Sequence, residues 1–394
     1  MKKLITILVL AVIIFTGCWD KVEIEQRGFV VAVGIDRDED EYSVTLIVPL
    51  MDGEKGDNAK NIQTAKGKTV SHAISKLDTR NSRQLYFGQT KILLLGEKLL
   101  ENGEMARNAV STMKGKLRAT RRVRVVAAES VKDVLSANPR AEIIAGSYIS
   151  NIYRDKDKIG GTSFTLTFER LTSLLSETNC IILPKIECHN DELILSGARI
   201  LPTGGESFEL STAKLRGLMW CVSGGNKGAV LPDFAVQVEK HSADVRFEVL
   251  GEGGALRVVV ELQVAVRGTD GEGGLSGGNG SNGERGLNDR NGSTSEGDLD
   301  GGGGLNGSNG ESNLNGSNGS NGERDLNSEI SREISSEILK TAEFLQEKGT
   351  DVYYWLEHLR KSDYGLYKEI SGAWGEVFRE IEVVPRVNVW YDEA

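Results

Sequence analysis

The stretch from Gly268 to Asn327 constrains this chain most, because it has no means of building a packed core. It consists almost entirely of Gly, Asn, Ser, Asp and Glu, with repeated Asn-Gly-Ser triplets and only isolated Leu residues. Such a composition buries too little apolar area to offset the entropy lost on ordering, so residues 268–327 are expected to be disordered. Closing a long loop costs little more than closing a short one, so this insert can interrupt a domain without destroying it.

The part before residue 193 mixes strands and helices. Phe29 to Ile35 is rich in β-branched residues and Tyr42 to Val48 alternates apolar with polar, which predicts an antiparallel hairpin. Thr69 is expected to cap a helix whose apolar residues recur at helical spacing. Because strands and helices do not alternate strictly, we predict an α+β fold rather than a doubly wound sheet, with an N-terminal domain over residues 18–192.

From residue 193 the predicted elements are mostly strands, and we place the start of the C-terminal domain there. Residues 193–267 hold the first part of it, with predicted strands at 193–201, 230–238, 245–249 and 256–266 and a helix at 211–220. Residues 328–394 hold the second part, which begins with a helix ending near Gly349. Asp351 is expected to cap a short helix, and a third helix covers 366–378. The chain ends on a strand, Glu382 to Trp390. Pro385 cannot donate to a ladder, so either this strand lies at a sheet edge or Pro385 lies on the open side of the strand.

The first 25 residues predict where the protein works. Lys2 and Lys3 precede an apolar run from Leu4 to Phe15, which is shorter than the roughly 20 residues a spanning helix needs. Thr16 and Gly17 then lead to Cys18, the pattern of a lipoprotein signal. We expect residues 1–17 to be removed as a signal peptide and Cys18 to carry a diacylglycerol that tethers the body to a membrane. Ordinary secretion and an uncleaved anchor are the alternatives.

Charge and cysteine content exclude several classes of protein. The chain has 47 Lys and Arg against 57 Asp and Glu, a net charge of -10, which argues against nucleic acid as a partner. The same balance argues against a body that lies on anionic lipid. Lipidation of Cys18 leaves Cys180, Cys188 and Cys221, an odd number, so a full disulfide framework is impossible. A bridge between Cys180 and Cys188 remains open, as does burial of free thiols.

Candidate chemistry is sparse. The four His residues fall on four different predicted elements, and no metal-binding, P-loop or nucleophile-elbow motif occurs. Cys188 and His189, between Glu187 and Asp191, are the one potential metal cluster, and a strand end with a solvated His is the competing interpretation. A basic run includes six residues: Lys114, Lys116, Arg118, Arg121, Arg122 and Arg124. It either binds an anionic headgroup or acidic partner, or forms a helix end and a solvated strand face. We therefore predict no catalytic residue, cofactor or metal.

Two blocks of sequence resemble a known family. Thr16-Gly17-Cys18-Trp19-Asp20, with the run from Gly28 to Asp36, resembles the start of spore germination lipoproteins of the Ger(x)C family, the C subunits of nutrient germinant receptors. Gly197-Ala198 with Leu201, followed by the segment Leu215 to Trp220, resembles the opening of the family's C-terminal domain, and Val245 to Val249 and Leu256 to Val266 follow as that domain's strands. The family's Asp-x-x-Gly-Phe-Gly region is here Asp351 to Leu356, without the two glycines.

The resemblance implies a function. It implies a non-enzymatic, multidomain α+β protein, anchored through Cys18 at the outer face of the spore inner membrane and working with polytopic A and B subunits in nutrient-triggered germination. Of the matching positions, only Cys18 has a defined chemical role. A substrate-binding lipoprotein of a transporter is the alternative function, although residues 193–266 fit its repeated βα lobes poorly. A secreted hydrolase lacks the expected nucleophile and metal motifs.

Overall fold

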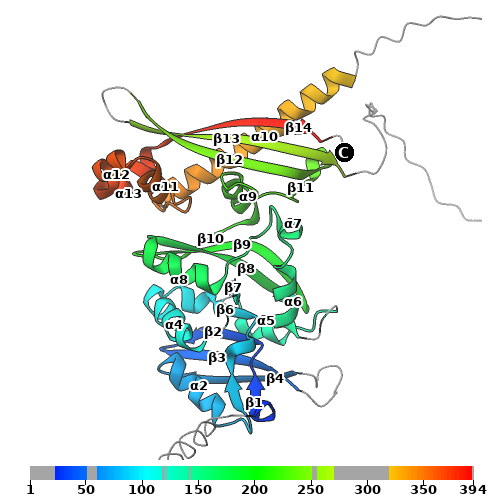
Figure 1. The fold of residues 1–394 in the computed structure, drawn as a ribbon, viewed down its shortest axis with the longest axis vertical. Coiled ribbons are helices and arrows are strands. Elements are labelled where there is room, and N and C mark those ends of the chain that lie inside the picture. Colours follow the sequence, from blue (N-terminus) through cyan, green and yellow to red (C-terminus); the bar gives the residue numbers. More distant parts are fainter. Residues whose placement is uncertain are drawn as a thin grey trace, which may run out of the picture.

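The structure is a computed structural model that describes residues 23–50, 60–117, 120, 122–140, 142, 144–250, 255–269 and 319–392. An eight-stranded sheet with its helices forms one end of the molecule, and a four-stranded sheet forms the other (Figure 1). The described chain begins at the first end, beside β1 (Arg27–Phe29), whereas the C-terminal strand lies at the second.

The eight-stranded sheet has the order β10-β9-β8-β7-β6-β2-β3-β4. Its strands, in chain order, are β2 (Ala32–Asp38), β3 (Glu41–Pro49), β4 (Lys60–Gly67), β6 (Ile92–Gly96), β7 (Arg124–Ala128), β8 (Cys180–His189), β9 (Glu192–Pro202) and β10 (Phe208–Leu210). The strands from β2 through β6 and β7 to β8 pair in parallel, and the outer pairs are antiparallel. The predicted hairpin is confirmed as β2 and β3.

Helices cover both faces of this sheet. The first face carries α2 (Val70–Asp78), α3 (Glu97–Leu100), α4 (Gly103–Lys116) and α8 (Phe168–Glu177). The second carries α5 (Val131–Ser136), α6 (Ala145–Ile152) and α7 (Lys156–Ile159). Strand β6 explains why the central strands read as unbroken apolar runs: Leu93 and Leu95 pack under the first set, and Ile92 and Leu94 under the second.

A small parallel pair lies at the end of the molecule remote from the four-stranded sheet. It joins β1 to β5 (Gln84–Tyr86), between the short 3-10 helices η1 (Ile24–Gln26) and η3 (Phe87–Gln89). The Tyr86 ring holds the pair together, because Arg27 lies over it at 4.6 Å and Phe29 meets it edge-on at 5.8 Å.

The four-stranded sheet has the order β11-β12-β13-β14. Its strands are β11 (Val230–Leu231), β12 (Val236–Leu250), β13 (Ala255–Gly268) and β14 (Glu382–Tyr391). Strand β13 is antiparallel to β12 and parallel to β14. The even-numbered residues from Leu256 to Val266 are buried in one cluster, as their alternation predicts. Pro385 lies on the edge strand β14, as predicted.

Helices α9 (Thr212–Trp220) and α10 (Gly319–Glu347) pack into the core of the four-stranded sheet. Beyond them come α11 (Trp355–Ser362), α12 (Tyr364–Ile370), η5 (Ser371–Ala373) and α13 (Trp374–Glu380). The multidomain α+β fold is thus confirmed. Within the described residues, no helix combines the length and apolarity that crossing a bilayer requires.

The domain boundary expected at residue 193 is not where the sheets divide. Strand β9 forms a hairpin with β8 in which His189 pairs with Glu192, and β10 then pairs with β9. Residues 193–202 and 208–210 therefore complete the N-terminal sheet. The shift from mixed helices and strands to mainly strands at residue 193 therefore occurs inside the N-terminal domain, where β9 and β10 extend its sheet.

The expected insert is also shorter than residues 268–327. Strand β13 reaches Gly268 and α10 already begins at Gly319, while residues 270–318 lie outside the described residues. A helix propagates more easily than it nucleates, so the apolar-periodic segment beyond Ile330 extends toward its N-terminus into polar sequence.

Two further predictions need correction. The strand expected over 230–238 is interrupted by η4 (Pro232–Phe234), where Pro232 begins a helical turn and Ala235 has a φ of 49°. The helix expected over 366–378 is divided into α12, η5 and α13, because the 3-10 turn Ser371–Ala373 breaks it at Gly372.

Candidate functional site

Cys18, the predicted lipidation site, lies outside the described residues, as do residues 1–17. The other three cysteines are free. Cys180 and Cys188 stand eight residues apart on the extended strand β8, a separation of roughly 26 Å at the usual rise per residue. A disulfide needs Cα atoms less than about 7 Å apart, so the bridge left open by the sequence does not form.

The potential metal cluster at the end of β8 does not assemble. Glu187 and Cys188 point to opposite faces of the sheet, and Cys188 packs against the apolar cluster beneath α5 and α6. The Glu187 carboxylate contacts Lys185 Nζ at 3.0 Å and His189 Nε2 at 3.1 Å. Among the described residues, no three His, Cys, Asp or Glu side chains gather to hold a metal ion.

His241 is the one histidine that the described structure buries. Its Nδ1 accepts a hydrogen bond from the Asn226 amide at 3.3 Å, and its Nε2 donates to the Trp220 carbonyl at 3.0 Å. Burial lowers the pKa of His241 to about 4, so the ring is neutral at physiological pH. Its role is to join α9 to β12, a role that no sequence pattern indicated.

The described members of the basic run from Lys114 to Arg124 lie in different environments. Lys114 and Lys116 are exposed at the end of α4, whereas Arg118 and Arg121 lie outside the described residues. Arg124 is half-buried on β7, and its guanidinium donates to Ser150 Oγ at 3.0 Å. The run therefore contains residues with different environments.

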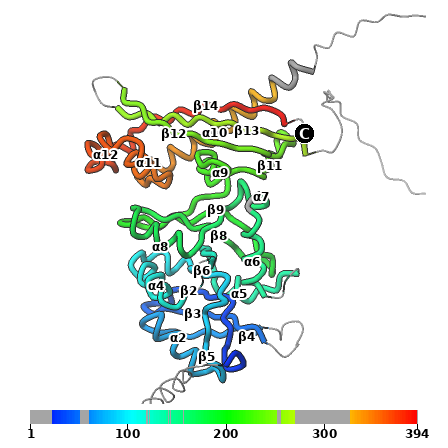
Figure 2. Tube along the Cα trace, viewed as in Figure 1, coloured from blue at the N-terminus to red at the C-terminus, as the bar shows by residue number. Residues whose placement is uncertain are grey.

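A groove of about 990 Å³ lies between the two sheets. Residues of α8, α11 and α12 contribute to its lining, and Figure 2 shows α8 on the same side of the molecule as α11 and α12. Its lining combines the end of α8, the β9–β10 turn and the segments that follow α10, including Asn179, Glu206, Lys348, Asp351, Trp374 and Arg379. Small-molecule sites commonly occupy hollows of this size between domains, which makes the groove the candidate site.

Asp351 anchors one wall of the groove. Its Oδ1 accepts the Trp355 amide at 3.2 Å, and its Oδ2 accepts the Leu356 amide at 3.0 Å and the Trp374 indole Nε1 at 3.1 Å. Asp351 thus accepts the first two amides of α11, as expected of a capping side chain, although the N-cap position itself is Tyr354. The sequence did not reveal the indole donor. Burial raises the pKa of Asp351 to about 6, although all three donors oppose that rise.

Tyr354 occupies the position of the first glycine in the Asp-x-x-Gly-Phe-Gly region of the family that this sequence resembles. Its backbone is left-handed, with φ 59° and ψ 34°, a conformation that favours glycine. The ring packs against the apolar clusters of both domains. This chain therefore places an aromatic side chain across the domain interface where a glycine would leave space.

A second contact ties the domains together beside Tyr354. The Cys180 thiol on β8 donates to the Asp351 carbonyl at 3.2 Å. Burial raises the pKa of Cys180 to about 12, so it stays a protonated donor rather than a reactive thiolate. The contact holds the wall of the groove against the N-terminal sheet.

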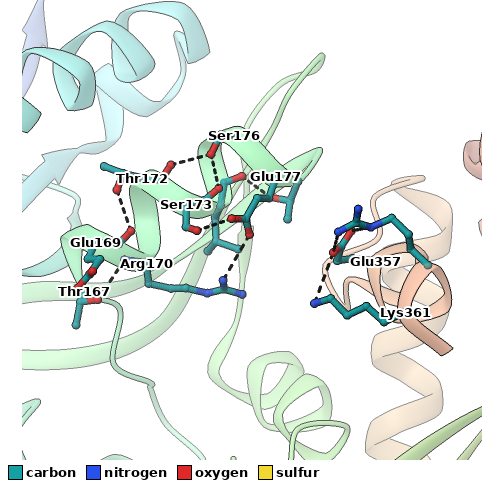
Figure 3. A network of polar contacts seen from close by, with 12 residues as sticks. Thr167, Glu169, Arg170, Thr172, Ser173, Ser176, Glu177, Glu357 and Lys361 are labelled. Atoms are coloured by element: carbon teal, nitrogen blue, oxygen red, sulfur yellow. Dashed lines mark hydrogen bonds and ion pairs between the residues drawn. The ribbon is translucent and has the colours of Figure 1, made fainter.

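The two rims of the groove carry charges that are paired within each domain (Figure 3). On α8, Glu177 accepts from Ser173 Oγ at 2.6 Å and lies 3.8 Å from Arg170. On α11, Glu357 lies 3.5 Å from Lys361 Nζ and accepts from Arg360 Nε at 2.9 Å. Figure 3 shows these two sets facing one another from different domains. Such rims can bind a polar ligand or a polar protein surface without rearranging the core.

A buried carboxylate joins the two segments on either side of the insert. Glu337 on α10 accepts from Trp220 Nε1 at 2.7 Å and from Arg216 Nε at 2.8 Å, and it also contacts the Arg216 terminal nitrogen. The hydrogen bond to Glu337 raises the pKa of Arg216 further. We call this contact of Glu337 with Arg216 and Trp220 the Glu337 joint. The sequence did not reveal it, because Glu337 lies on a helix that also carries many exposed acidic residues.

Two family models match the chain. The model described as spore germination protein N-terminal domain matches residues 20–188, and the one described as spore germination B3/GerAC-like, C-terminal, matches residues 305–390. The crystal structure of the GerBC protein aligns with 91% of this chain and 96% of its own, with a TM-score of 0.50 and 14% sequence identity. That likeness shows a shared fold.

Three curated relatives from Bacillus subtilis (strain 168) are similar over parts of their length. The putative spore germination protein YfkR is 30% identical over 36% of this chain and 40% of its own. Spore germination protein KC is 33% identical over 24% of this chain and 26% of its own, and spore germination protein A3 is 22% identical over 51% and 55%. The chain thus spans between about a quarter and about half of these relatives' lengths.

Proposed function

The chain belongs to the GerAC family of spore germination proteins, and from this membership we propose that it is a lipid-anchored subunit of a nutrient germinant receptor. A role in spore germination follows from the family itself. The finer proposal is that this subunit acts by assembling with polytopic A and B subunits at the outer face of the spore inner membrane.

One observation carries the proposal. The N-terminal and the C-terminal family models both match, in the order in which the family has them, on the two domains of one fold. The described residues add support of a second kind: the Glu187 carboxylate is paired with Lys185 and His189, the Asp351 carboxylate accepts amides of α11, and no cluster of metal ligands assembles among the described residues. We therefore propose a binding subunit rather than an enzyme.

The proposed mechanism depends on the tether. A diacylglycerol on Cys18 supplies two acyl chains, which hold a protein at a bilayer far more stably than one. Restricting the body to the membrane surface raises its effective concentration beside the polytopic subunits. Weak contacts between the folded body and those subunits then suffice for assembly.

The test replaces Cys18 by Ala in the full chain expressed in its spore-forming host. We expect the variant to leave the membrane fraction and nutrient-triggered germination to fall to the level of a deletion. Cys188→Ala is the matched control, since it removes a partly buried thiol and should keep both properties. Full germination by a Cys18→Ala protein recovered in the soluble fraction would refute the anchoring mechanism.

The groove between the domains favours a second candidate function, that of a substrate-binding lipoprotein of a transporter. Its size suits a small solute, and both its rims are polar. Thermal unfolding with amino acids or sugars at millimolar concentration discriminates the two. A rise in Tm that Trp374→Ala abolishes supports ligand binding, and an unchanged Tm across both classes of solute supports assembly alone.

A further inference from the structure

We propose that the outer edge of strand β12, over residues 244–250, pairs with the same edge of a second copy of this chain in a two-fold symmetric dimer. We call residues 244–250 the free edge. The dimer joins the two four-stranded sheets into one continuous sheet. The inference goes beyond the proposed function, because it concerns contact between copies of the subunit and neither its anchoring nor its polytopic partners.

The part of β12 before the free edge has its outward backbone groups covered. Strand β11 pairs only with the first two residues of β12. Farther along, the His241 carbonyl accepts the Gly224 amide at 3.0 Å. The Ser223 hydroxyl donates to the Ala243 carbonyl at 2.8 Å and accepts the Ala243 amide at 2.9 Å. The backbones of His241 and Ala243 thus face away from β13, toward the segment before β11.

The free edge has no such cover within the described residues. Backbone groups alternate between the two sides of a strand, so the outward amides and carbonyls beyond Ala243 belong to Val245, Phe247 and Val249. No hydrogen bond within the described part of the chain reaches them. Strands β12 and β13 run to the margin of the molecule at their hairpin end (Figure 1). Such an edge is a template for pairing with another strand.

The opposite edge of the same sheet is protected by devices that the free edge lacks. Pro385 on β14 has no amide to donate, and the Val387 carbonyl accepts the Ser331 hydroxyl of α10 at 2.9 Å. The free edge contains neither proline nor lysine, the residues that commonly block a strand edge. Of the two edges of this sheet, the free edge is therefore the one that remains able to pair.

The order of charges along the free edge selects a second copy as its occupant. Asp244, Arg246 and Glu248 lie on the face opposite the core, because Val245 and Phe247 pack against the core. In an antiparallel pair centred on Phe247 of both copies, Arg246 of each chain lies directly opposite Glu248 of the other. Sliding one chain by two residues places Arg246 opposite Arg246 or Glu248 opposite Glu248, which is unfavourable. The edge is thus self-complementary in one register.

The surrounding charges do not upset this match, because they are balanced within each chain. The other acidic and basic residues of β12, β13 and β14 form four ion pairs: Arg257 with Glu382 at 2.7 Å, Glu261 with Arg386 at 3.4 Å, Lys240 with Asp392 at 2.7 Å, and Arg267 with Glu239 at 2.8 Å. Asp244 contacts Arg246 of its own chain at 2.9 Å and falls opposite Leu250 of the second copy. The match therefore depends on the order of signs and not on a net charge.

The core-facing side of the free edge supplies an apolar contact. Val249 has 52% of its surface exposed, although it continues the row of Val245 and Phe247. In the same register, Val249 of each copy lies opposite Val245 of the other, and the two Phe247 side chains meet at the symmetry axis. Cross-strand pairs of aromatic and β-branched residues stabilise a sheet. Dimerisation thus covers the exposed Val249.

The first test reverses charges in the chain from residue 18 onward with Cys18→Ser, which removes the tether and keeps every described residue. Sedimentation equilibrium from about 5 to about 500 µM covers the weak association expected of an interface below about 1,200 Å². The parent should show a monomer–dimer equilibrium. R246E and E248R each turn both ion pairs into like-charge contacts, about fivefold per pair, so each should dimerise about 25-fold more weakly. An equimolar mixture of the two variants should regain the dimer, because every Glu then faces an Arg.

R386E is the matched control. It makes the same change of charge on the same face and, like R246E, removes a contact to Glu261, but it lies on the opposite edge of the sheet. It should dimerise like the parent, and circular dichroism melting checks that every variant folds. A parent that stays monomeric at all concentrations, equal loss in R246E and R386E, or no recovery in the mixture would overturn the proposal.

A second test reads the register without reversing a charge. Mixing the R246C and E248C chains under mild oxidation should give a disulfide-linked dimer, whereas each variant alone should not, because only the unlike positions lie within about 7 Å of one another. Equal cross-linking of either variant with itself would contradict the register. A monomeric parent would leave the edge to a strand of a different protein. None of these outcomes depends on lipidation of Cys18, so they leave the proposed anchoring untouched.

Discussion

Removing the Glu337 carboxylate should destabilise the C-terminal domain. Glu337 is 8% exposed and serves two donors that come from the other side of the insert, the Trp220 indole and the Arg216 guanidinium. In Glu337→Ala, the fully buried indole N–H loses its acceptor, which costs about 1–3 kcal/mol. Removing one partner of a buried ion pair costs about 3–5 kcal/mol, because the other charge stays buried without a partner. Because the Arg216 side chain is 27% exposed and can reach water, we expect about 3 kcal/mol.

The assay is urea unfolding followed by tryptophan fluorescence. Four of the five tryptophans, at positions 220, 355, 374 and 390, lie in the C-terminal domain, so the signal reports on that domain. Glu333→Ala, an exposed acid one turn earlier on α10, is the matched control and should stay within about 0.5 kcal/mol of the parent. The reasoning fails if Glu337→Ala is as stable as Glu333→Ala. Replacing both partners, as R216M/E337M, should recover part of the loss, since no charge is then left unpaired.

Two further predictions concern the same domain. Gly217→Ala should destabilise the domain by about 2 kcal/mol, because the added Cβ would lie 2.2 Å from Thr341 Oγ1 and 2.4 Å from the Glu337 carbonyl oxygen. Gly375→Ala, on α13, meets open space and should stabilise the domain by up to about 1 kcal/mol. Urea unfolding measures both changes. The pKa of Asp351 is raised from 3.8 to about 6, so its contribution to stability is present below pH 4 and lost as pH rises through 6. The stability of the parent relative to Asp351→Asn should therefore fall by up to about 3 kcal/mol between pH 4 and 7 in melts at several pH values, and a pH-independent difference would contradict this.

Features with a local cause were readable from sequence. The Thr69 cap accepts the His72 amide as predicted, and the alternating residues of β13 form one buried face. Both depend on residues close together in the chain, where periodicity and side-chain chemistry determine the outcome. The same holds for Asp351, whose capping role required only the two amides that follow it by four and five positions.

Features formed by distant residues were not readable. The groove and the Glu337 joint unite segments more than a hundred residues apart, and no period links them. The boundary at 193 was wrong because a strand of the first sheet and a strand of the second have the same alternation, so only the pairing of β9 with β8 distinguishes them.

The arrangement of the C-terminal domain explains how it tolerates an insert between β13 and α10. However residues 270–318 are arranged, the greatest entropic cost of joining β13 to α10 by about 50 residues rather than about 10 is roughly 1.4 kcal/mol. Opposing it are the parallel pairing of β14 with β13, from Arg257–Glu382 to Val266–Tyr391, and the Glu337 joint. Each lies between a segment before the insert and a segment after it. The joint alone exceeds the closure cost, so the two halves remain one domain, and the length of the insert can vary without separating them.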